Sequence, residues 1–187
     1  MLDVTWEWIA LDQAALDLAN TVAIEKGVEH DLLEREGEYA RWAQAAARSP
    51  QLAPEEAAVI ARAQTHVLAL REHVRAVLKA TAAGETLPNR PVAALNDASR
   101  AAPEWTQVAA DGKVLRRAHG TPVVRLLAGY ARSAMEIAAD GKSRLRVCGA
   151  PSCGMFYRPR RRQQRWCSEP CGNRARFARH YARQTSA

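Results

Sequence analysis

Apolar residues recur at a helical period through most of the first part of the chain, up to residue 141. The clearest stripe repeats every three or four residues and comprises Ile60, Ala63, Val67, Leu70, Val74 and Val77. Pro54, Glu55 and Glu56 suit the turn ahead of it, because proline needs no backbone donor there and acids favour the positive end of a helix. Gly84 is a typical stop signal. The pattern therefore predicts one long helix from Pro54 to Gly84.

Helical spacing predicts further helices at residues 12–25, 30–47, 92–101 and 122–139. Asp12 is a suitable N-cap for the first of them. The last is apolar over a wide face, which is typical of a helix that is largely buried. The front of the chain is therefore expected to be mainly helical.

The hydrophobic period changes at residues 105–117, where short alternating segments flank Asp111 and Gly112. Alternation around an Asp-Gly turn predicts a β-hairpin. Residues 6–9 would add a third strand. The expected fold class is α+β, mainly α.

A polar segment at residues 140–143 separates the two parts of the chain. We expect residues 1–141 to form one domain and residues 142–187 a small module. The net charge of +7 divides unevenly between them, with +11 on the module and −4 on the domain. Such asymmetry indicates a polyanionic partner for the basic part.

Four cysteines, and no others, lie in the module with the spacing C-x4-C-x13-C-x3-C, at Cys148, Cys153, Cys167 and Cys171. Two close pairs separated by a longer gap are typical of one tetrahedral structural Zn²⁺. The alternatives are a disulfide pair or free core cysteines, but nothing indicates the oxidising compartment that disulfides need. Four thiolates close the coordination sphere, so we expect no enzyme activity.

The cysteine pairs are expected to lie on recognisable elements. Residues 144–147 and 155–157 alternate as short strands, and a helix should run from Pro170 to about Arg183. The second cysteine pair then falls at the positive N-terminal end of that helix, which favours thiolates. This order of elements predicts a treble-clef-like zinc finger that ends in a basic helix.

The chain start, MLDVTWEWIALDQAALDLAN, lacks the basic leader and apolar run of a signal peptide. No apolar stretch reaches the roughly 18 residues that a membrane-spanning helix needs. We therefore expect a cytoplasmic, nucleoid-associated protein with no membrane partner.

Nine arginines and no lysine occur within residues 158–183. The arginine fork suits bidentate contact with phosphates and guanine edges, which indicates double-stranded DNA as the partner. The expected contacts lie in the loop between the cysteine pairs and on the last helix: Arg158, Arg160, Arg161, Arg162, Arg165, Arg176, Arg179 and Arg183. Phe177 and Tyr181 fall on the opposite helix face, where we expect them to cover the zinc core.

Two other functions use the same residues. An RNA-binding protein would stack unpaired bases on Trp166, Phe156 and Tyr157. A zinc-fold nuclease would need a histidine base and an open metal position, whereas the only histidine in the module is His180. A preference for single strands over duplex would indicate the RNA-binding protein. Mg²⁺-dependent cleavage of DNA would indicate the nuclease.

Two sets of motifs resemble known families. Cys148-Gly-Ala-Pro-Ser-Cys153-Gly-Met-Phe156 followed by Cys167-Ser-Glu-Pro-Cys171-Gly172-Asn173-Arg174 resembles the CGNR zinc finger. Leu16-Asp17-Leu18-Ala19-Asn20-Thr21 and Leu70-Arg71-Glu72 resemble the ABATE domain. The resemblance implies a bacterial stress-induced transcription regulator, with a sensory N-terminal domain and a DNA-binding finger whose four cysteines hold zinc. Residues 157–162 are more basic than the family pattern, so a shared base preference need not carry over. Asn173 either braces the site or touches DNA.

Polar residues of the first predicted helix offer a site for a small-molecule effector. Asp17, Asn20 and Thr21 fall on one side of it, and Arg71, Trp42 and Trp105 are candidate companions. The alternative, which we prefer, is a solvated face with a local hydrogen bond from Thr21 to Asp17. A homodimer would suit a regulator, because paired half-sites multiply affinity, but no seam is visible in the sequence.

Overall fold

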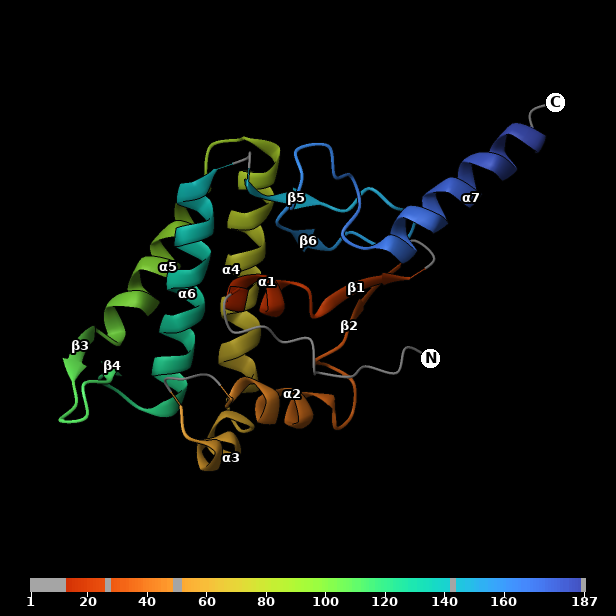
Figure 1. Cartoon of the computed structure of the whole chain (residues 1–187). Coiled ribbons are helices and arrows are strands. Elements are labelled where there is room, and N and C mark those ends of the chain that lie inside the picture. Colours follow the sequence, from red (N-terminus) through yellow and green to blue (C-terminus); the bar gives the residue numbers. More distant parts are fainter. Residues whose placement is uncertain (1–12, 26–27, 49–51, 142–143, 186–187) are drawn as a thin grey trace.

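Three helices of the computed structural model lie side by side and contact one another: α4 (Gln64–Ala83), α5 (Asn89–Ala101) and α6 (Pro122–Asp140) (Figure 1). The structure describes residues 13–25, 28–48, 52–141 and 144–185. The apolar stripe predicted from the sequence is buried in this bundle, with Val67 and Val74 fully inaccessible to solvent. The predicted α+β class, mainly α, is confirmed.

The long helix predicted from Pro54 is interrupted. The chain forms a 3-10 turn, η3 (Pro54–Glu56), and a short helix, α3 (Ala57–Ile60), before α4 begins. In a continuous helix the Ile60 carbonyl would accept the N–H of Gln64. Here it accepts the Ala63 N–H and the Tyr39 hydroxyl, both at 2.9 Å. These two bonds replace the helical one, and Gly84 ends α4 in the left-handed conformation, as predicted.

The first predicted helix is wrong beyond its second turn. Helix α1 (Ala14–Ala19) ends early, and β1 (Val22–Glu25) then pairs antiparallel with β2 (Val28–Asp31). Side chains take the carbonyls that a longer helix would use. The Thr21 hydroxyl donates to the Leu18 carbonyl at 2.7 Å, and Arg75 Nη1 donates to that of Ala19 at 2.8 Å. Helix α2 (Glu38–Ala46) correspondingly starts later than predicted, after β2.

The remaining elements of the N-terminal domain agree with the sequence prediction. Strands β3 (Glu104–Val108) and β4 (Val114–Ala118) form the expected hairpin. Helices α5 and α6 lie within three residues of their predicted bounds, and the Thr121 hydroxyl accepts the Val124 N–H at the start of α6. The strand predicted at residues 6–9 lies outside the described residues. In the described ranges, no helix has both the length and the apolar character to cross a membrane.

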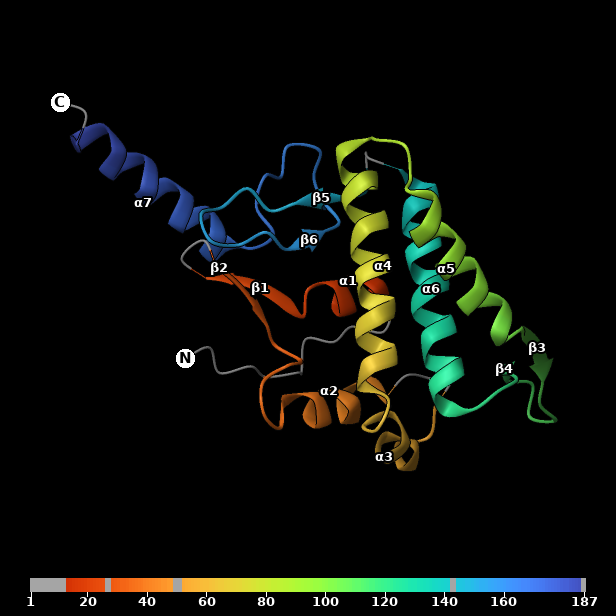
Figure 2. The ribbon, with the colours of Figure 1, turned by 180° about the vertical axis from the view of Figure 1, so that it is seen from behind.

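The cysteines belong to a small C-terminal unit, residues 144–185, which we call the zinc module. It contains an antiparallel pair, β5 (Arg146–Val147) and β6 (Phe156–Tyr157), followed by α7 (Glu169–Thr185). Figure 2 shows this unit beside α1 and α4, with α7 pointing away from the rest of the molecule. Leu145 and Phe156 are buried in the same core as α1 and α4, so the module and the domain share apolar packing.

Candidate metal centre and nucleic-acid interface

The four cysteine sulfurs form a compact cluster, all within 4.8 Å of one another. Cys153 Sγ lies 3.7 Å from Cys167 Sγ and 3.6 Å from Cys171 Sγ. Cys167 Sγ lies 3.5 Å from Cys171 Sγ. A tetrahedron of thiolates about 2.3 Å from Zn²⁺ has S···S separations of about 3.8 Å. The donor set and its spacing therefore fit one structural zinc ion.

Local backbone geometry brings the two cysteine pairs together. Cys148 and Cys153 lie on the turn between β5 and β6, closed by the Cys148 N–H bond to the Met155 carbonyl at 2.8 Å. Cys171 lies in the first turn of α7, and Cys167 lies two residues before the start of this helix. The start of α7 presents its positive end to the sulfurs, which stabilises thiolates.

Additional donors point at the sulfurs. The Cys167 N–H donates to Cys148 Sγ at 3.4 Å. Arg174 Nη2 donates to Cys171 Sγ at 3.2 Å. Hydrogen bonds of this kind orient metal ligands and offset thiolate charge. Arg174 therefore acts on the metal centre, although it lies in the arginine-rich helix.

The sulfur cluster also perturbs its own ionisation. The hydrogen bond from Cys167 lowers the pKa of Cys153 to about 5. The same bond raises the pKa of Cys167 far above its usual value, and burial raises the pKa of Cys148. Adjacent thiolates repel one another, so the four do not all ionise on their own. A bound dication removes this repulsion and holds all four as thiolates.

The zinc module is fastened to α1 through Asn20. Its Nδ2 donates to the Phe156 carbonyl at 2.9 Å, and its Oδ1 accepts the Phe156 N–H at 2.8 Å. Beside this pair, a Cβ added at Gly154 would lie 2.4 Å from Ile24 Cδ1. Strand β1 therefore packs directly on the backbone of the turn between β5 and β6. Arg158 forms an ion pair with Asp140 at the end of α6.

The predicted effector residues do not converge on one cavity. Asp17 and Asn20 border a groove of about 670 Å³ between α1 and the zinc module, whereas Thr21 and Arg71 do not. Thr21 is buried and accepts a hydrogen bond from Arg71 Nη1 at 3.2 Å. The preferred alternative, a solvated face, is wrong as well, because all four residues are buried. The local bond of Thr21 runs to Leu18 instead of Asp17.

Arg71 has a clear structural partner. Its guanidinium forms an ion pair with Asp31, with Nη1 donating to Oδ1 at 2.7 Å. Burial alone would raise the pKa of Asp31, but the hydrogen bond and charge of Arg71 outweigh it and hold that pKa below its usual value. The pair fixes β2 to α4. Strand β2 in turn pairs with β1, the strand that packs on the zinc module.

The predicted tryptophan companions lie apart from the groove. Trp42 is fully buried between Tyr39 and Tyr130, with ring centroids 5.4 Å and 6.1 Å away. Trp105 packs against His119 on the distant β3–β4 hairpin. Trp42 is therefore a core residue, and the hairpin end of the bundle is separate from the module (Figure 1).

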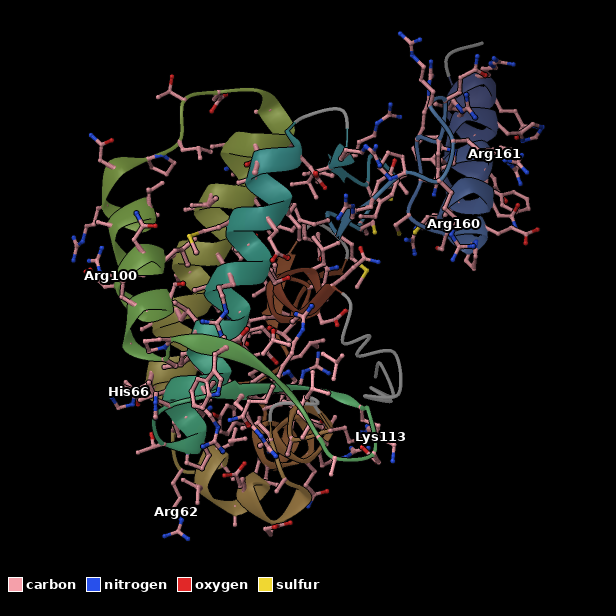
Figure 3. All side chains as sticks on the ribbon, turned by 60° about the vertical axis from the view of Figure 1, so that its left-hand side comes forward. Arg62, His66, Arg100, Lys113, Arg160 and Arg161 are labelled. Carbon is pink, nitrogen blue, oxygen red and sulfur yellow. The ribbon has the colours of Figure 1, made fainter. Side chains whose placement is uncertain are left out.

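Most of the predicted nucleic-acid residues are exposed together. They lie in the loop before α7 and along it: Arg160, Arg161, Arg162, Arg165, Arg176, Arg179 and Arg183. Figure 3 shows Arg160 and Arg161 beside α7, at the end of the molecule remote from Arg62. Arg158 differs, because it is half-buried and paired with Asp140.

Side chains of the zinc module hold the backbone of the arginine-rich loop, residues 158–165, in place. Arg146, a residue that the sequence analysis did not single out, donates from Nη1 to the Gln164 carbonyl at 2.5 Å and from Nη2 to the Arg162 carbonyl at 2.6 Å. The Tyr157 hydroxyl donates to the same Gln164 carbonyl at 2.9 Å. These bonds fix the loop backbone and leave its arginine heads toward solvent.

The expected role of Phe177 and Tyr181 is wrong. They are 66% and 65% exposed and do not cover the zinc core. That core consists of Cys148, Ala150, Cys153, Tyr157 and Cys171, with Trp166 against it. Helix α7 meets this core through its first turns, where Cys171, Gly172 and Ala175 are buried, because the core is too small to follow the helix further. Asn173 lies within α7, is exposed and accepts a hydrogen bond from Arg176.

Two family comparisons agree with this arrangement. Residues 12–141 match ABATE, described as "Putative stress-induced transcription regulator". Residues 144–184 match zf-CGNR, the CGNR zinc finger. Among curated proteins, none matches the chain.

Proposed function

This chain belongs to the ABATE family and carries a zinc-binding CGNR finger, and from this premise we propose that it regulates transcription by binding double-stranded DNA through its zinc module. The bound zinc fixes the turn between β5 and β6 against the start of α7. Helix α7 and the preceding loop then contact the duplex, and the N-terminal domain adjusts that contact in response to stress or to a ligand.

The observation that carries this proposal is the position of α7. Helix α7 points away from the body of the protein (Figures 1 and 2). Beyond Ala175 its residues are exposed through Gln184, and among them are Arg176, Arg179 and Arg183. Glu169 is the only acid from residue 144 to the end of the chain. A free helix with positive charge along it suits the major groove, which admits an α-helix between two rows of phosphates.

RNA binding is the second candidate, and the structure gives it less support. Phe156 and Tyr157 are only 6% and 7% exposed, and the Asn20 amide covers the Phe156 backbone. Bases cannot stack on rings that are already packed inside the protein. Only Trp166, which is half-buried, stays partly accessible among the three predicted stacking residues.

The groove between α1 and the module supports the regulatory part of the proposal. It is bordered by Asp17 and Asn20 on one side and by Arg160 and Arg176 on the other. A ligand held there would touch both the N-terminal domain and residues expected on DNA. Binding of the ligand would then change the affinity of the module for DNA without a large movement of either part of the protein.

Fluorescence anisotropy with a labelled duplex tests the proposal, using zinc-loaded and chelator-treated protein over a salt series. We expect zinc-dependent binding that weakens steeply as salt rises. Single-stranded RNA of the same length is the competitor. Tighter binding to RNA, or no binding to duplex at low salt, would contradict the proposal, and Mg²⁺-dependent cleavage of the label would indicate a nuclease.

A further inference from the structure

The aromatic residues of α7 are exposed and belong to neither apolar core of the described residues. Phe177 and Tyr181 are the most exposed aromatic side chains among the described residues, at 66% and 65%. Tyr181 has an edge contact with the His180 ring, with centroids 6.1 Å apart. A phenylalanine held in water gains free energy when a partner covers it.

The helix geometry shows which way this face points. Ala175 is 4% exposed and marks the side of α7 that faces the zinc core. At 100° per residue, Phe177 lies about 160° from Ala175 around the helix. Tyr181 lies about 120° from it on the same side. Phe177 is therefore centred on the outward face of α7.

Arginines lie to one side of this face: Arg176 is about 100° and Arg183 about 120° from Phe177 around the helix. Arg176 and Arg183 lie about 100° and 80° from Ala175, in the opposite sense to Phe177. Both are exposed, and the sequence from Cys171 to the end of the chain contains no acid. Two copies of α7 packed through this face would bring together two helices of high positive charge, which repel one another. The charge instead favours a polyanion whose surface also carries apolar groups.

Duplex DNA offers such a surface. On the floor of the major groove, the C5-methyl of thymine is the apolar group that a side chain can contact. A helix that enters with its outward face brings Phe177 to this floor while the arginines to one side of it reach phosphates. We propose that Phe177, with Tyr181 one turn further on, determines sequence specificity by packing on thymine C5-methyl groups. This inference rests on the proposed DNA-binding function.

The test changes the methyl group and leaves the base pairing intact. Zinc-loaded protein is titrated into labelled duplexes of about 20 base pairs, two helical turns, of alternating dA and dT or of dA and deoxyuridine. A second pair of duplexes, alternating dG and dC, differs only in C5-methylation of cytosine. We expect the methylated member of each pair to bind about fourfold more tightly for each methyl group buried.

Variants assign the effect to the side chain. Phe177→Ala should bind both members of each pair equally, and Phe177→Leu should recover part of the preference. Ala178→Ser, at the neighbouring position of the same helix, is the matched control and should keep the full preference for the methylated duplex. Circular dichroism and zinc content establish that each variant is folded.

The outcomes separate this inference from the function on which it rests. No binding to any duplex overturns the DNA-binding function itself. Binding without methyl discrimination, or equal discrimination by wild type and Phe177→Ala, leaves DNA binding in place and overturns the role of Phe177. Conversion of a dimer to a monomer by Phe177→Ala, with methyl discrimination unchanged, would overturn that role and assign the aromatic face to a second copy.

Discussion

The side-chain amide of Asn20 pairs with the main chain of Phe156 as a neighbouring β-strand would, donating to its carbonyl at 2.9 Å and accepting its N–H at 2.8 Å. The two residues are 136 positions apart in the sequence. Both hydrogen bonds are buried, so the amide is the protein partner on which these two main-chain groups of Phe156 depend. This contact makes the zinc module part of the N-terminal core.

Replacing Asn20 with alanine should loosen the module. The change leaves a buried donor and a buried acceptor without partners, and we expect a loss of about 2–4 kcal/mol in the free energy of unfolding. Urea unfolding of the zinc-loaded protein measures it. Asn173→Ala, at an exposed site, is the control and should change stability by less than about 0.5 kcal/mol. Equal stability of the two variants would show that the Asn20 contact is not formed in solution.

Gly154→Ala should also weaken the contact with β1. The new Cβ would lie 2.4 Å from Ile24 Cδ1, and the backbone there has a φ of +72°. We expect a destabilisation of about 1–3 kcal/mol from the clash and the left-handed backbone together. The double variant Gly154→Ala with Ile24→Ala should recover only the steric part, and a double-mutant cycle in urea measures that coupling. Strict additivity would contradict the packing of Ile24 on Gly154.

Loss of a zinc ligand should unfold the zinc module and spare the helical bundle. With Cys167→Ala or after chelation, residues 144–185 keep too little apolar core to fold. Amide signals of these residues in a ¹H–¹⁵N NMR spectrum should collapse to unfolded positions, while those of α4, α5 and α6 stay dispersed. Gln163→Ala, at an exposed position of the loop between the cysteine pairs, is the control. If the amide signals of residues 144–185 stayed dispersed in Cys167→Ala, the structural role of the metal would be contradicted.

The Asp31–Arg71 pair should contribute a measurable pH dependence. Arg71 holds the pKa of Asp31 below its ordinary value of 3.8. The folded state therefore binds the proton less readily than the unfolded state, and the stabilisation is present above pH 4 and is lost as the pH falls through the folded pKa.

Asp31→Asn removes that contribution. We expect the variant to be less stable than wild type at pH 7, with the difference shrinking toward pH 3. Urea midpoints measured across this range test it, and zinc loss at acid pH affects both proteins alike. Glu72→Gln, at the exposed partner of Arg71, should cost much less. A constant difference at every pH would contradict the assignment.

Arg183→Gln should weaken duplex binding by losing a phosphate contact. We expect the slope of log affinity against log salt to fall by about 0.9. Arg100→Gln is the control, because Arg100 is exposed on α5 at the far end of the molecule and pairs with Asp97 (Figure 3). Fluorescence anisotropy from low to high salt gives both slopes. An equal change in the two variants would indicate non-specific attraction to the whole protein.

Local signals predicted the local structure well. The cysteine spacing predicts the metal cluster because each pair is set by a few residues of backbone, and Gly84 ends α4 because a left-handed residue is needed there. The Asp111-Gly112 turn likewise predicts the β3–β4 hairpin. In each case the chemistry that decides the structure lies within a few positions of the chain.

Contacts between distant residues decide the rest. Helix α1 stops at Ala19 because Arg75, on another helix, takes its carbonyl, and Tyr39 takes the carbonyl of Ile60 that would have continued α3. Asn20 gives no periodic signal that it pairs with Phe156. The exposure of Phe177 follows from the size of the zinc core, which helical period alone does not report.

The Asn20 contact has a consequence for the order in which the chain assembles. Synthesis produces α1 early, but its partner strand β6 emerges only after all three helices of the bundle. Closing a contact across 136 positions costs chain entropy unless the intervening residues have already folded. The N-terminal bundle should therefore form first and offer Asn20 as a docking point. Zinc capture and docking of the module would then follow as a later folding step.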